Sequence, residues 1–88
     1  MQSATFTIVN RLGLHARAAA QLVQTANKFK SDVTVEKDGT EVNGKSIMGL
    51  LMLAAPQGVT IRVSVKGEDA DEALETIGQL IDDGFGED

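Results

Sequence analysis

His15 is the only histidine in this chain, and it lies where a loop containing Gly13 gives way to a helical pattern from Ala16 onward. The backbone N–H groups of a first helical turn have no intrahelical partners, and the helix dipole favours negative charge there. Arg17 adds a fixed positive charge whose forked donors match a phosphate group. A neutral imidazole is nucleophilic near pH 7, and a phosphate carried on nitrogen leaves readily. These residues predict reversible phosphoryl transfer through His15.

A purely structural interpretation of His15 stays open at this point, because a helix-capping or partly buried histidine needs no chemical role. Hydrolytic catalysis is poorly supported, since the chain has no second histidine and spacing identifies no Ser/Asp partner. Cysteine is absent, and a single histidine cannot build a histidine-rich metal site. We therefore expect no metal and no cofactor.

Ser46 precedes the apolar run of residues 47–53 and is a candidate N-cap for a short helix. A phosphate on this serine would be favourable at a helix N-terminus and would repel an acidic partner. The residues themselves predict a structural cap at Ser46, and a phosphate at this position would be compatible with that prediction.

The apolar run of residues 47–53 holds more large side chains than one short helix can bury, and Leu50 and Leu53 are the better candidates for the core. Met48, together with Ala16 and Ala20, would then form an apolar patch beside the histidine, as a docking partner requires. The residues predicted to bind partners are Ala16, Ala20, Ile47, Met48 and Leu51.

The net charge of −5 is unevenly distributed along the 88 residues. Residues 1–45 carry six Lys/Arg and four Asp/Glu, whereas residues 46–88 carry two Lys/Arg and nine Asp/Glu. The histidine thus lies in the basic half, which favours an anionic ligand there. We expect no nucleic-acid partner, because there is neither a basic stripe nor an aromatic platform for bases.

The N-terminus lacks the pattern of a signal peptide, and no span is long and apolar enough to cross a bilayer. We therefore expect a cytoplasmic protein without stable membrane association.

Alternating polar and apolar residues predict four strands, and apolar residues at helical spacing predict three helices. The strands are expected at residues 5–9, 32–36, 41–43 and 59–65, with Asp38 and Gly39 in a hairpin turn. The helices are expected from residue 16 to residues 28–30, over residues 47–53, and from Asp69 to Gly84, with Asp69 and Glu72 in a capping box. This order predicts one α+β domain over residues 1–88, with a mostly antiparallel sheet and helices on one face.

Residues 13–17 (GLHAR) and 44–50 (GKSIMGL) resemble HPr, the histidine-containing phosphocarrier of the bacterial sugar phosphotransferase system. The resemblance covers essentially the whole chain, and two such motifs at this spacing are a strong signal. It implies an open-faced β-sandwich, in which a four-stranded antiparallel sheet is covered by three helices on one face. It also implies that His15 accepts phosphate on Nδ1 from enzyme I, charged by phosphoenolpyruvate, and donates it to an enzyme IIA-type acceptor in sugar uptake or its regulation. Arg17 would help to neutralise the phosphate, and the protein would be a carrier without turnover of its own in place of an enzyme.

The resemblance further implies that an HPr serine kinase/phosphorylase could modify Ser46, and that the residues around Met48 contact partners. We expect a monomer. The chain departs from the family at Ala18, where proline is common, and at Gln24 and Asn27, where some members carry lysine. We expect a slightly less rigid helix start and unchanged phosphorylation, while fewer positive charges leave the partner less defined than the chemistry.

Two alternative interpretations remain at this point. Residues 50–53 and 81–88 look more like the nitrogen-related branch of the family, whereas the Ser46 motif looks more like carbohydrate-type members. The chain could then be a regulatory docking module of the same fold that signals by its phosphorylation state. The other alternative is a ferredoxin-like α+β domain that binds a metabolite or dimerises. It leaves the pairing of His15 with Arg17 unexplained, and a His15 ring packed inside the core would favour it.

Overall fold

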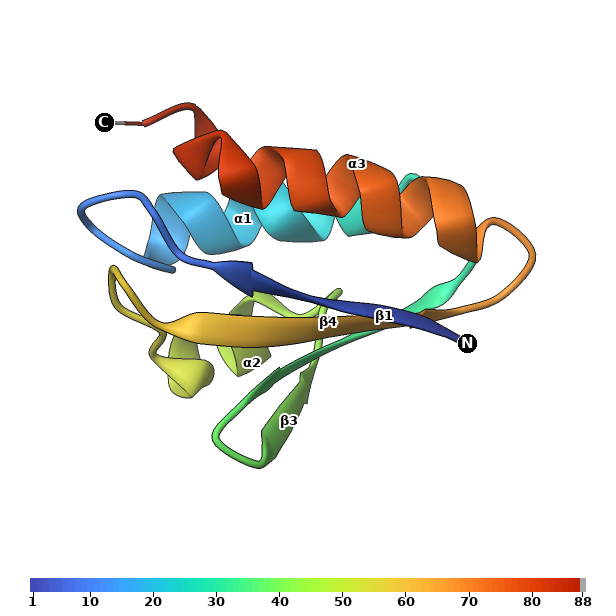
Figure 1. The fold of residues 1–88 in the computed structure, drawn as a ribbon, viewed down its shortest axis with the longest axis horizontal. Coiled ribbons are helices and arrows are strands. Elements are labelled where there is room, and N and C mark those ends of the chain that lie inside the picture. Colours follow the sequence, from blue (N-terminus) through green and yellow to red (C-terminus); the bar gives the residue numbers. More distant parts are fainter. Residues whose placement is uncertain (88) are drawn as a thin grey trace.

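The computed structural model describes residues 1–87 and contains a four-stranded antiparallel sheet with three helices (Figure 1). The strands, in the spatial order β1-β4-β2-β3, are β1 (Gln2–Thr7), β4 (Thr60–Lys66), β2 (Asp32–Lys37) and β3 (Thr40–Asn43). The helices are α1 (Ala16–Ala26), α2 (Ile47–Leu53) and α3 (Ala70–Asp82), followed by a single 3-10 turn, η1 (Gly84–Gly86). The predicted α+β class and open-faced antiparallel sheet are thus confirmed.

One face of the sheet is apolar because the strand register aligns the alternating apolar residues. Val35 pairs with Val42 on one side and Val63 on the other, and Phe6 pairs with Ile61. Helices α1 and α3 lie side by side over this face (Figure 1), and α2 contacts both α1 and β3. Leucines from α2 join the same buried cluster as the strand valines, so one core supports all three helices.

The other face of the sheet is polar and open. Across its middle, Thr5 pairs with Arg62, Arg62 with Glu36, and Glu36 with Glu41. Alternate residues along each strand therefore point into the core, and the residues between them point to solvent, as expected for a sheet covered on one side.

Two predicted boundaries are wrong. Strand β1 begins at Gln2 and ends at Thr7, because its length follows the hydrogen-bonding partners on β4, where Gln2 pairs with Val65. Helix α1 ends at Ala26, before the predicted residues 28–30, and the chain then tightens through bonds between residues three apart, such as Phe29 N–H to the carbonyl of Ala26. Phe29 still packs against the core.

The predicted capping box at the start of α3 is also wrong. Asp69 is the N-cap residue, but its carboxylate makes no side-chain capping bond to the helix within residues 1–87. Instead, the carboxylate accepts hydrogen bonds from the N–H of Lys30 (2.9 Å), the N–H of Ser31 (3.0 Å) and the Ser31 hydroxyl. Asp69 therefore ties the start of α3 to the loop between α1 and β2.

Replacing Asp69 by asparagine is expected to lower the midpoint of thermal unfolding at pH 7 and to have little effect in acid. The hydrogen bond from the Ser31 hydroxyl, then that from the Lys30 N–H, holds the pKa of Asp69 below its ordinary value of 3.8. A lowered folded-state pKa stabilises the fold above pH 3.8, and this contribution is lost as the pH falls through the folded-state pKa.

The measurement is thermal unfolding of both proteins from pH 7 down to pH 2, with Glu68→Gln as a control of equal charge change at an exposed neighbour. The two curves of midpoint against pH should converge in acid. A gap that stays constant over the whole range would contradict an ionised Asp69 as its source.

Candidate functional site

His15 is held at the N-terminus of α1 by buried neighbours on both sides. Leu14 is buried, and its N–H donates to the carbonyl of Ala55 (2.9 Å), while Ala18 and Ala19 are buried in the first turn of α1. The first helical bond runs from Ala19 N–H to the carbonyl of His15 (2.8 Å), so the preceding N–H groups of the helix have no intrahelical acceptor. The imidazole is 27% exposed. His15 is therefore a helix-start residue that solvent can reach, and the core-packed histidine that would have favoured the ferredoxin-like alternative is not observed.

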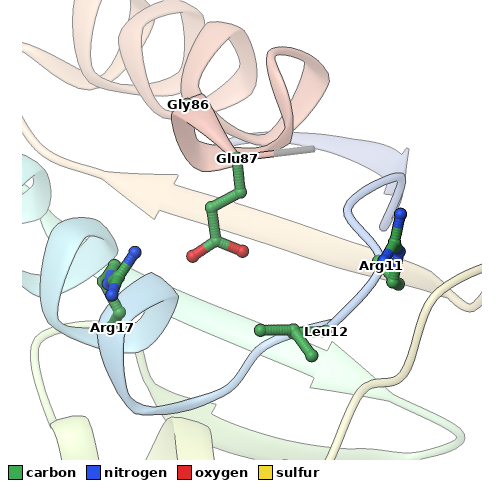
Figure 2. A pocket seen from close by; sticks show the side chains of 5 residues that line it. All are labelled: Arg11, Leu12, Arg17, Gly86 and Glu87. Atoms are coloured by element: carbon green, nitrogen blue, oxygen red, sulfur yellow. The ribbon is translucent and has the colours of Figure 1, made fainter.

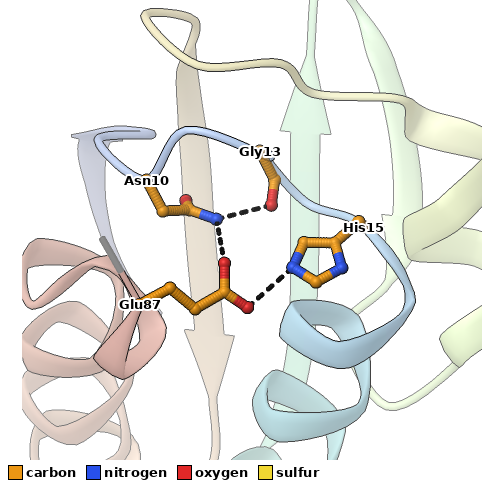
Figure 3. A network of polar contacts seen from close by, with 4 residues as sticks. All are labelled: Asn10, Gly13, His15 and Glu87. Atoms are coloured by element: carbon orange, nitrogen blue, oxygen red, sulfur yellow. Dashed lines mark hydrogen bonds and ion pairs between the residues drawn. The ribbon is translucent and has the colours of Figure 1, made fainter.

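The imidazole of His15 contacts the C-terminal end of the described chain. Its Nε2 lies 2.7 Å from Oε2 of Glu87, and Oε1 of Glu87 accepts from the side-chain amide of Asn10 at 3.0 Å (Figure 3). The same amide nitrogen donates to the carbonyl of Gly13 at 2.7 Å. Residues from the loop after β1, the start of α1 and the C-terminal turn thus form one polar network.

The C-terminal turn places Glu87 because three successive residues adopt left-handed backbone conformations. Their φ angles are +65° at Gly84, +58° at Phe85 and +73° at Gly86. Phe85 is 1% exposed, and its burial anchors the turn against the core. The chain after α3 therefore ends beside the loop that follows β1 (Figure 1).

Glu87 is a carboxylate at neutral pH. Its partial burial by itself would raise its pKa, but hydrogen bonds from Asn10 and His15, together with the positive charge of Arg17, outweigh that effect. The net result is a pKa below the ordinary value of 4.5. The carboxylate is therefore an acceptor in both of its contacts near pH 7.

Two arginines line a shallow pocket beside the network. Arg11, Leu12, Arg17, Gly86 and Glu87 form its walls, and the carboxylate of Glu87 extends into the space between the two arginines (Figure 2). Both arginine side chains are exposed. The pocket that Glu87 enters is therefore lined by positive charge from Arg11 as well as from Arg17, which the sequence predicts.

Ser46 is the N-cap of α2, as predicted. Its hydroxyl oxygen accepts a hydrogen bond from the N–H of Gly49 at 3.0 Å. The side chain is half-buried, and the residues around it separate into buried and exposed sets, with Leu50 and Leu53 in the core. The prediction that Leu50 and Leu53 are the core residues of this helix is therefore confirmed.

The exposed side of α2 is a cluster of large apolar side chains, which we call the α2 surface. Its members are Ile47 (43% exposed), Met48 (69%), Leu51 (38%) and Met52 (77%). Ala16 is exposed and Ala20 is half-buried on α1, and the two helices contact each other. An exposed group of this kind on a small domain is typical of a docking surface.

Two residues of the network, Asn10 and Glu87, were not predicted as site residues. Glu87 is 72 residues from His15 in the chain, and no periodicity or motif links the two. Asn10 carries the only available signal, since asparagine before Gly13 is a common turn residue whose side chain bonds to nearby backbone. The neighbouring Asp88, part of the segment that resembles the nitrogen-related branch, lies outside the described residues.

Within residues 1–87, no three His, Asp or Glu side chains come together as a set that could hold a metal ion. None of the helices in this part of the chain combines the length and apolar character that a bilayer span requires.

The fold and the exposed histidine at the start of α1 define a small α+β protein of the open-faced β-sandwich type. The family model described as the PTS HPr component phosphorylation site matches residues 2–83. The chain therefore belongs to the HPr family of phosphocarrier proteins of the phosphotransferase system, whose members carry phosphate and are not catalysts.

Individual relatives agree with this assignment over nearly the full length. The phosphocarrier protein HPr of Xylella fastidiosa (strain Temecula1 / ATCC 700964) is 52% identical over 82 residues, which cover 93% of this chain and 92% of the relative. The crystal structure of HPr-C-His from Thermoanaerobacter tengcongensis superposes with a TM-score of 0.96 at 48% identity, covering 100% of this chain and 99% of the other. A crystal structure of an HPr dimer from the same organism gives a TM-score of 0.79 at 48% identity, covering 99% and 100%.

Proposed function

We propose that His15 accepts a phosphoryl group on Nδ1 from enzyme I, charged by phosphoenolpyruvate, and donates it to an enzyme IIA-type acceptor. The observation that carries this proposal is the position of the imidazole. It is part-exposed at the first residue before α1, and Nε2 is engaged with Glu87 while Nδ1 faces away from that carboxylate (Figure 3). Among the residues that the structure describes, the recorded partner of the ring is on Nε2, which supports Nδ1 as the nucleophile.

The surroundings of His15 suit a bound phosphate dianion. The N–H groups at the start of α1 and the positive end of its dipole stabilise negative charge. Arg17 supplies a guanidinium two residues along the helix, at the mouth of the shallow pocket. Because the same groups can act on the phosphate whether it is arriving or leaving, they support transfer in both directions.

We infer that both partners dock on the α2 surface and the adjoining part of α1, including Ala16 and Ala20. The α2 surface presents four exposed apolar side chains on a helix that contacts α1. A central apolar contact with a charged rim is the usual arrangement of such transient complexes.

Ser46 is a candidate second phosphorylation site, the target of an HPr serine kinase/phosphorylase. Its half-buried hydroxyl lies at the N-terminus of α2, directly beside Ile47 and Met48. A dianion there would place negative charge next to the proposed docking surface and repel an acidic partner. A carrier of this kind works in the cytoplasm, and we propose that it acts as a monomer.

The direct test is to incubate the chain with enzyme I and radiolabelled phosphoenolpyruvate. We expect one phosphate per chain, labile in acid and stable in base, as phosphohistidine is. An acid-stable label would place the phosphate on a hydroxyl and overturn the assignment to His15.

A further inference from the structure

The carbonyl and carboxylate oxygens in the network around His15 can only accept hydrogen bonds. The groups that face them must therefore carry the hydrogens. The side-chain nitrogen of Asn10 faces two oxygens, the carbonyl of Gly13 (2.7 Å) and a carboxylate oxygen of Glu87 (3.0 Å). Both oxygens can only accept, so the amide must present its NH₂ group to them. Asn10 is 1% exposed, so its amide cannot turn freely.

The second oxygen of Glu87 is 2.7 Å from Nε2 of His15. A carboxylate cannot donate, so Nε2 must carry a hydrogen for this contact to be favourable. In a neutral imidazole only one nitrogen is protonated, and Nδ1 then keeps its lone pair. The chain of contacts from Gly13 through Asn10 and Glu87 therefore selects one tautomer of His15.

We propose that Glu87, held by Asn10, is a positioning residue that keeps Nε2 of His15 protonated and Nδ1 available for phosphate. This role rests on the proposed function of His15. Neither residue touches the phosphate in this role, because both act through the opposite edge of the imidazole. The C-terminal turn η1 is the element that delivers the carboxylate to that edge.

The transfer step balances with this assignment. The lone pair of Nδ1 forms the new N–P bond, while the bond from phosphorus to the donor breaks and its electron pair stays with the donor. Nε2 keeps its proton, so the phosphorylated ring carries positive charge that the carboxylate of Glu87 offsets. When the phosphoryl group moves on, the N–P bonding pair returns to Nδ1 and the ring is neutral again.

The substitution Glu87→Gln tests this role better than Glu87→Ala, because it reverses one hydrogen bond at nearly constant shape. The NH₂ group of Asn10 still requires an oxygen, so the glutamine must turn its carbonyl towards Asn10 and its own NH₂ towards His15. Nε2 then becomes the acceptor and Nδ1 receives the proton. Alanine removes the contact without imposing either tautomer.

The experiment combines ¹⁵N NMR of the imidazole, recorded above pH 8, with the rate of loading by enzyme I. We expect the unchanged protein to be mainly protonated on Nε2, Glu87→Gln mainly on Nδ1, and Glu87→Ala mixed. Because a wrong tautomer removes the nucleophilic lone pair, loading should fall about tenfold or more in Glu87→Gln and about threefold in Glu87→Ala. Asp82→Asn, an exposed carboxylate near the end of α3, matches the charge change and should behave as the unchanged protein.

A tautomer or a loading rate in Glu87→Gln that equals that of the unchanged protein would overturn the role of Glu87. A purely structural role would instead make alanine the more harmful substitution, because glutamine preserves the packing. The NMR arm needs no phosphate donor, so it decides the tautomer even where enzyme I fails to load the chain. That failure would refute the proposed function alone.

Discussion

Replacing His15 by alanine is expected to abolish phosphorylation by enzyme I and phosphoenolpyruvate while leaving the protein folded. No second histidine exists in the chain to accept the group. The ring is part-exposed and makes no side-chain capping bond to α1 within the described residues. The free energy of unfolding should therefore change by about 1 kcal/mol or less.

The measurement compares incorporation of radiolabel with the urea midpoint of the same preparation. Gln79→Ala, on an exposed position of α3, serves as the control and should be labelled as the unchanged protein is. Labelling of His15→Ala at the unchanged level would show that another residue carries the phosphate. A loss of label accompanied by unfolding would contradict the expectation that the variant stays folded.

Replacing Gly13 by alanine is expected to damage both stability and loading. Gly13 has a φ of +68°, and a Cβ there would lie 2.6 Å from the carbonyl oxygen of Ala55 and 2.8 Å from Cα of Pro56. Both are backbone atoms, so the loop must move. Left-handed strain and overpacking together should cost about 2–4 kcal/mol of the free energy of unfolding.

Movement of this loop also reaches the imidazole. The carbonyl of Gly13 accepts from Asn10, which holds Glu87 against His15. Loading should therefore slow even under conditions in which the variant is fully folded.

The matched control is Gly58→Ala, because Gly58 also has a positive φ (+91°) but an added Cβ would meet no described atom within 4 Å. It should cost about 1 kcal/mol from backbone strain alone and leave loading unchanged. The measurements are urea unfolding and the loading rate of both variants. Equal losses of stability would contradict the contact with Ala55 and Pro56 as the source of the difference.

The sheet and helices were predictable because this chain uses local signals consistently. Alternation along residues 32–36 and 59–65 places valines on one face, and the register then aligns Val35 with Val63. The N-cap at Ser46 was predictable because a serine immediately before an apolar run offers its oxygen to the first turn.

The wrong predictions concern residues whose local structure is determined by a contact with a distant part of the chain. Asp69 has the sequence context of a capping residue, yet its carboxylate bonds to Lys30 and Ser31, almost 40 residues away in the chain. The start of β1 is defined by its partner strand, since Gln2 and Ser3 show no apolar alternation of their own.

The site was predictable only in part for the same reason. His15 and Arg17 lie within three residues of each other, so a motif can show both. Glu87 reaches His15 because the turn η1 after α3 places it there, a backbone path that no spacing in the sequence reveals.

The transfer of phosphate onward from His15 is the most direct test of a carrier. The labelled chain, separated from enzyme I, is mixed with an unphosphorylated enzyme IIA-type protein, and the label is followed on both proteins and in solution. We expect the label to leave the chain for the acceptor in a one-to-one ratio. Label that stays on the chain, or that appears as inorganic phosphate equally fast without the acceptor, would contradict a carrier function for His15.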